Sequence, residues 1–81
     1  MESIKERVYG FKTKHKEGFV KGEIDELLKD YPNINMEKFD NALTGITCAL
    51  VDNEIVIYHC DIELALRCGV EDRKPRSWEL D

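Results

Sequence analysis

The sequence of 81 residues lacks the long apolar segments that membrane insertion and secretion require. No apolar run approaches the roughly 18 residues that a membrane-spanning helix needs. Residues 1–7, MESIKER, contain no apolar stretch of the kind found in a secretory signal. Only three cysteines are present, without the paired spacing of a disulfide framework. We therefore expect a cytoplasmic protein with reduced thiols and no contact with a membrane.

Familiar catalytic and cofactor-binding motifs are also missing. The five glycines are scattered, so there is no phosphate-binding glycine loop. No nucleophile elbow, zinc-protease motif, calcium loop or kinase signature occurs. A chain of this length buries only about 60–65% of its unfolded surface, which leaves little room for an enclosed active site. These absences favour a protein that is not an enzyme and that functions through its surface.

What the sequence does contain is a large share of charge, which is distributed unevenly. Charged residues make up 36% and hydrophobic residues 42%, a composition typical of a folded globular domain. Residues 1–21 carry six basic and three acidic residues, whereas residues 22–81 carry six basic and fourteen acidic ones, for a net charge of −5. The acidic body disfavours nucleic acid as a ligand, because phosphate neutralisation supplies most of that affinity. It favours a protein partner with a basic surface.

The length predicts a single domain over residues 1–81, with less regular segments at both ends. We expect residues 1–18 to form a flexible basic segment and residues 70–81 an extended tail, since neither shows a sustained apolar period. The N-terminal segment supports two interpretations. Ser3 followed by Glu6 matches a capping box, which predicts a short helical turn. Residues 8–13 are rich in aromatic and β-branched side chains and equally predict an extra N-terminal strand.

Apolar residues at helical spacing predict two successive helices. The first covers residues 21–30 and is stopped by Pro32, because the residue before a proline avoids the helical region. The second covers residues 36–43, with Asn35 as a suitable N-cap. The link between them is short, so we expect the two helices to pack as an angled or antiparallel pair.

A β-hairpin and a third helix follow. Two β-rich runs, residues 46–51 and 54–59, are separated by Asp52-Asn53, which predicts a two-residue turn. The sheet face that carries Ile55 and Ile57 is the more apolar one and should meet the helices. The third helix should start after Asp61 as N-cap and end at Gly69. It is apolar around most of its circumference, so it is either buried or pairs with a second chain in a homodimer.

The expected architecture is therefore a small α+β domain of the order α-α-β-hairpin-α, with a possible extra N-terminal strand. Helices should cover one face of the small antiparallel sheet. A third strand would help, since an isolated hairpin is only marginally stable.

One candidate site is a metal centre. Thiolates and imidazoles suit tetrahedral zinc, which would help to stabilise so small a domain. The spacing contains no CxxC pair, and the alternative is that the cysteines are small buried hydrophobes. On the zinc hypothesis the protein is a zinc-stabilised structural or adaptor domain. The candidate ligands are Cys48, His59, Cys60 and Cys68.

A second candidate site is an acidic patch on the outer sides of the first two predicted helices. Such a patch would suit a basic partner protein. The alternative is that these carboxylates compensate helix dipoles and are otherwise solvated. Trp78 is a candidate aromatic anchor, because interface energy often concentrates in such residues. The acidic candidates are Glu23, Asp25, Glu26, Asp30, Glu37 and Asp40.

The basic N-terminal segment offers another alternative. Lys12, Lys14 and Lys16 lie beside Tyr9 and Phe11, and interleaved cations and aromatics are a feature of single-strand binders. So few cations on an acidic body would give only weak, salt-sensitive binding to nucleic acid.

The layout around residues 39–45 (FDNALTG) and 58–65 (YHCDIELA) resembles small accessory proteins of phages and mobile elements, a group that includes the anti-CRISPR inhibitors. The resemblance covers residues 20–69 and rests on size, charge and the lack of catalytic motifs. It implies an inhibitor of a CRISPR effector nuclease, or of another nucleic-acid enzyme, that binds without catalysis. No functional residue is carried over from it.

Overall fold

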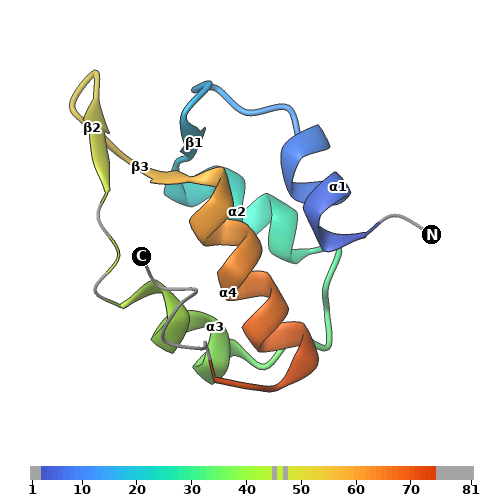
Figure 1. The fold of residues 1–81 in the computed structure, drawn as a ribbon. Coiled ribbons are helices and arrows are strands. Elements are labelled where there is room, and N and C mark those ends of the chain that lie inside the picture. The colour runs from blue at the N-terminus through green and yellow to red at the C-terminus, as the bar shows by residue number, and fades with distance from the viewer. Residues whose placement is uncertain (1–2, 45, 47, 75–81) are drawn as a thin grey trace.

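A helix of 13 residues, α4 (His59–Glu71), runs through the middle of the fold, and the other elements pack around it (Figure 1). The computed structural model describes residues 3–44, 46 and 48–74. Within these residues the chain forms an α+β domain, so the predicted fold class is confirmed. The other elements are α1 (Ile4–Gly10), β1 (Gly18–Phe19), α2 (Lys21–Leu28), α3 (Met36–Leu43), β2 (Ala49–Val51) and β3 (Glu54–Tyr58).

The N-terminal segment begins with a helix. The Ser3 hydroxyl accepts a hydrogen bond from the Glu6 amide at 3.1 Å, which caps α1 as the sequence predicts. Val8 is fully buried where α1 packs on α4. The alternative of a strand over residues 8–13 is wrong. The third strand is instead β1, whose Phe19 enters the core opposite Ile57.

The loop between α1 and β1 is anchored to the body at several points. His15 is buried, and its backbone bridges to Gly18. The Thr13 hydroxyl donates to the His15 carbonyl, and the Lys14 ammonium pairs with Glu54 of β3. The described part of residues 1–18 thus consists of a helix, a loop anchored to the body of the domain, and the start of a strand.

Helices α2 and α3 form close to where the sequence predicts them. The Glu23 carboxylate accepts a hydrogen bond from the Val20 amide at 3.2 Å, which satisfies one of the free donors at the start of α2. The Asn35 side chain accepts from the Lys38 amide at 3.2 Å and caps α3, whose bounds match the prediction. The predicted first helix is two residues too long, because α2 ends at Leu28.

The hairpin has the predicted turn but a shorter ladder. Asp52 and Asn53 both adopt left-handed φ angles, 50° and 66°, as a two-residue turn with a right-handed strand twist requires. Val51 lies opposite Glu54, in the register expected from the sequence. The second strand ends at Tyr58, and His59 belongs to α4 rather than to the strand. In the sheet, β3 is the central strand, with β1 on one side and β2 on the other.

Helix α4 is longer at both ends than the sequence predicts. It begins two residues before Asp61 and continues through Gly69. A Cβ at Gly69 would lie 2.5 Å from Cγ1 of Ile34 and 3.2 Å from the Asn35 carbonyl oxygen. This glycine therefore permits close packing of α4 on the α2–α3 link and does not end the helix. Asp72 ends it, with a left-handed φ of 54°.

The core lies between α4 and the elements around it. The burial predicted for the third helix is confirmed, because its apolar side is enclosed within the chain. Residues 70 and 71 of the expected tail belong to α4, and residues 75–81, including Trp78, lie outside the described residues. Among the described helices, none has the length and apolar character needed to cross a membrane. The buried residues of α4 are Ile62, Leu64, Ala65, Leu66, Cys68 and Gly69.

Candidate functional site

An open apolar groove lies between α2, α3 and β3. It has a volume of about 340 Å³. Each of the three elements turns one periodic face toward it, because helix neighbours recur every three or four residues and strand neighbours every two. The apolar side chains that line the groove are Ile24, Leu28, Met36, Phe39, Leu43, Ile55 and Ile57.

The apolar lining is graded from a buried floor to an exposed rim. Phe39 is 2% exposed and Ile24 7%, so they form the floor. Met36 is 44% exposed and Ile55 65%. The sheet face with Ile55 and Ile57 borders the groove, but the prediction that helices cover it is only partly correct. Ile55 and its cross-strand partner Leu50 are exposed, whereas Val56 on the opposite face is fully buried. An apolar surface left open in this way is typical of a binding site.

Two carboxylates edge the groove, one on each of the two lining helices. Asp25 lies on α2 and Asp40 on α3, and both are exposed. Neither carboxylate has an ion-pair or hydrogen-bond partner among the described residues. Lys21, the first residue of α2, also lines the groove and marks one end of it. The rim therefore combines two unpaired negative charges with one positive charge.

The remaining members of the predicted acidic patch have other roles. Glu23 caps α2 and also accepts a hydrogen bond from the Lys14 amide at 2.6 Å. Glu26 pairs with Lys29 at 3.2 Å, and the Asp30 carboxylate pairs with Arg7. Glu37 is exposed in the first turn of α3. The six candidates thus do not act as one uniform patch, and Asp25 and Asp40 are the two that edge the groove.

The four predicted zinc ligands are not brought together. Cys48 precedes β2, whereas His59 and Cys60 lie at the start of α4. Cys68 is buried eight residues further along α4, a rise of about 12 Å. The three cysteines, all within the described residues, form no disulfide with one another. Among the described residues, no group of three or more His, Cys, Asp or Glu side chains could hold a metal ion.

His59 instead joins an aromatic cluster at the start of α4. Its ring stacks on Tyr9 with centroids 5.3 Å apart and meets Phe19 edge-on at 5.1 Å. Partial burial, together with the nearby Cys60 and acidic residues of α4, raises the pKa of Tyr9. Burial also raises the pKa of Asp61. The ring contacts of His59 with Tyr9 and Phe19 hold α1 and β1 against α4. The side chain of His59 therefore contributes to packing.

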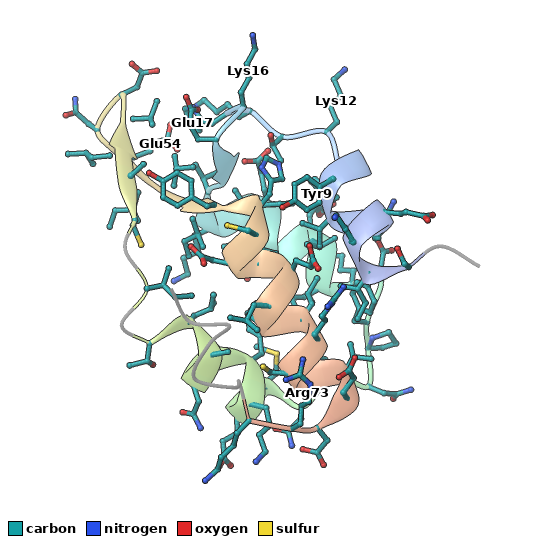
Figure 2. All side chains as sticks on the ribbon, viewed as in Figure 1. Tyr9, Lys12, Lys16, Glu17, Glu54 and Arg73 are labelled. Atoms are coloured by element: carbon teal, nitrogen blue, oxygen red, sulfur yellow. The ribbon has the colours of Figure 1, made fainter. Side chains whose placement is uncertain are left out.

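The basic loop is partly neutralised by carboxylates. Lys14 is paired with Glu54, while Lys12 and Lys16 point away from the body (Figure 2). Glu54 also lies 3.9 Å from Nε2 of His15, which is buried and has no hydrogen-bond partner among the described residues. Binding of nucleic acid through this loop stays a prediction.

The Lys14–Glu54 pair is expected to stabilise the loop only over a defined pH range. The hydrogen bond from Lys14 lowers the pKa of Glu54, and the same bond raises the pKa of Lys14. The contribution of Glu54 is present above the unfolded carboxyl pKa of about 4.3 and is lost as pH falls through the lower folded value. That of Lys14 is present below about 10.4 and is lost as pH rises through the higher folded value.

A double-mutant cycle with Lys14→Met and Glu54→Gln, measured by urea unfolding, checks this expectation. The coupling between the two residues should be measurable at pH 7 and smaller at pH 3. It should also weaken in concentrated salt. A cycle of Lys12→Met with Glu54→Gln serves as the control and should show no coupling. A coupling that is as large at pH 3 as at pH 7 would contradict the assignment.

The sequence alone does not predict the groove. Its apolar residues fall on helix and strand faces that the sequence predicts to be covered. The signal that could have located it is the repeated seven-residue interval on two consecutive helices, from Lys21 to Leu28 and from Met36 to Leu43. Only the packing of the two helices and the sheet shows that these faces enclose a common space.

Comparison of the chain with protein-family models, curated proteins and solved structures found no match.

Proposed function

We propose that the protein is a small, non-enzymatic protein-binding module that binds a basic partner at the groove between α2, α3 and β3. The observation that carries the proposal is the apolar lining edged by the unpaired carboxylates of Asp25 and Asp40. Apolar contacts supply most of the affinity at such surfaces, and complementary charge supplies specificity and rate of association.

The chemistry of the lining supports binding rather than catalysis. Besides its apolar residues, the groove is lined by Lys21, Asp25 and Asp40. No cysteine, serine or histidine is among the described residues that line it. The serine–histidine and cysteine–histidine pairs that commonly carry out covalent catalysis are therefore not part of this lining.

Two matched double variants test the proposal. Met36→Gln with Ile55→Gln removes exposed apolar side chains from the groove, one on a helix and one on a strand. Val70→Gln with Tyr58→Gln is the control, because these residues are also exposed, at 46% and 37% compared with 44% and 65%. Neither control residue lines the groove. All four sites tolerate a polar residue because they already face solvent.

The measurement is selection of peptides from a random library displayed on phage, followed by affinity determination. The selected peptides should combine lysine or arginine with apolar residues. The groove variant should lose about tenfold or more in affinity for the selected peptides, whereas the control should stay within about twofold. A tenfold loss corresponds to the free energy gained by burying roughly two methylene groups. Peptides that bind both variants equally would overturn the proposal. The resemblance to anti-CRISPR inhibitors adds a CRISPR effector nuclease as one proposed partner, to be tested with the same variants in a cleavage assay.

A further inference from the structure

The backbone around the groove limits the conformation of whatever binds there. β3 is the central strand, and each of its edges is paired over part of its length, with β1 at Ile57 and Tyr58 and with β2 at residues 54–56. Within α2 and α3 the backbone groups bond along the helix, apart from those of the end turns. A bound segment therefore meets the side chains of Ile55 and Ile57 on the face of β3 and finds at most a short run of unpaired backbone groups along its edges. Since buried backbone groups have to be hydrogen-bonded, a segment that fills the groove must satisfy its own.

The length of the groove is that of a short helix. The lining residues of α2 run from Lys21 to Leu28, and those of α3 from Met36 to Leu43. Each interval of seven residues corresponds to about 10.5 Å, or two helical turns. An apolar stripe of matching length recurs at positions i, i+3, i+4 and i+7 of an amphipathic helix, which is a common way for a helix to occupy a groove.

The charges of the groove favour cationic residues on both sides of the apolar stripe of such a helix. Asp25 lies on the α2 wall and Asp40 on the α3 wall, so a helix in the groove would meet an unpaired carboxylate from each of the two lining helices. Cations on both flanks of its apolar stripe would pair with them. Long Lys and Arg side chains can also cover the exposed rim at Met36 and Ile55 with their methylene stems. A second copy of this chain is a poor occupant, because each copy carries the same net charge of −5.

From these three observations we infer that the groove binds an amphipathic helix of a partner protein, at least two turns long, with lysine or arginine on both flanks of its apolar stripe. The inference rests on the proposed function and specifies the ligand of the same site. The groove supplies the apolar contact. The carboxylates of Asp25 and Asp40 hold the bound helix between the walls of the groove.

The test uses three synthetic peptides of 18 residues and the full-length protein. The first places leucine at i, i+3, i+4 and i+7 between lysine flanks. The second has the same composition, with leucine and lysine alternating in the strand pattern. The third is the first with glutamate in place of lysine. Affinity is measured by calorimetry, and peptide helicity by the carbon chemical shifts of labelled peptide in the complex.

The helical lysine peptide should bind at least about tenfold more tightly than the alternating peptide and be helical when bound. Asp25→Asn with Asp40→Asn should weaken it about fivefold, whereas the control Glu26→Gln with Asp52→Asn should leave it unchanged. The glutamate peptide should not bind. If the alternating peptide binds as tightly and remains sensitive to Met36→Gln with Ile55→Gln, the helix inference fails while the proposed function stands. If none of the peptides depends on the groove residues, both fail.

Discussion

Replacement of Gly18 by alanine is expected to detach β1 from the sheet and to lower the free energy of unfolding by about 3 kcal/mol or more. A Cβ at this position would overlap the carbonyl oxygen of Ile57 and lie 2.8 Å from Cα of Tyr58. Both atoms belong to the backbone of the central strand, which cannot move aside as a flexible side chain would. The strain falls beside Phe19, which is fully buried, so the damage extends into the core.

Gly22→Ala is the matched control for Gly18→Ala. No atom lies within 4 Å of a Cβ at Gly22, which is exposed within α2. Alanine is favoured over glycine inside a helix, so the control should gain up to about 1 kcal/mol. Urea unfolding followed by circular dichroism measures both variants. Equal midpoints for Gly18→Ala and the unmodified protein would show that β1 is not held against β3 as described.

Replacement of Gly69 by alanine is the second substitution with a large expected effect. The new Cβ would meet the Ile34 side chain at 2.5 and 2.8 Å, although alanine is otherwise the better helix former. The overlap should outweigh the gain in helix propensity, for a net loss of about 1–2 kcal/mol. Strain should also weaken the hydrogen bond from the Asn35 amide to the Gly69 carbonyl, which joins the start of α3 to α4.

A double-mutant cycle of Gly69→Ala with Ile34→Ala tests whether the loss of stability comes from overlap between the new Cβ and the Ile34 side chain. Shortening Ile34 removes both of the side-chain atoms that the new Cβ would meet. The double variant should therefore be more stable than the sum of the single losses predicts, by about 1 kcal/mol or more. If the two losses simply add, the destabilisation by Gly69→Ala does not arise from contact with Ile34.

Local signals explain why much of the fold is predictable from the sequence. The Asn35 cap and the apolar period of α3 lie within a few residues of each other, so they define that helix without tertiary information. The turn at Asp52-Asn53 is similarly local. Gly69 shows the limit of such signals, because a glycine that ends a helix and one that permits close packing are identical in sequence. Its function depends on Ile34, which lies 35 positions earlier.

The candidate site was less predictable for the same reason. Which carboxylates are unpaired depends on cations that are distant in the sequence. Arg7 neutralises Asp30, whereas Asp25 and Asp40 have no such neighbour in the part of the chain that the structure describes. The zinc hypothesis depended on placing His59 in a strand with its side chain toward Cys48. Stacking on Tyr9 and the early start of α4 give His59 a different position. A two-residue strand such as β1 has too few residues to show any period.

The central position of α4 has a consequence for how the protein is made. In the order of synthesis, α4 follows the other described elements, yet it supplies the surface on which α1 and α3 pack. While residues 1–58 are being translated, Val8 and Phe39 have no partner helix to cover them. The domain therefore cannot fold progressively from its N-terminus as synthesis proceeds. It must wait until α4 has left the ribosome, and a chain released before then would expose its apolar residues to aggregation.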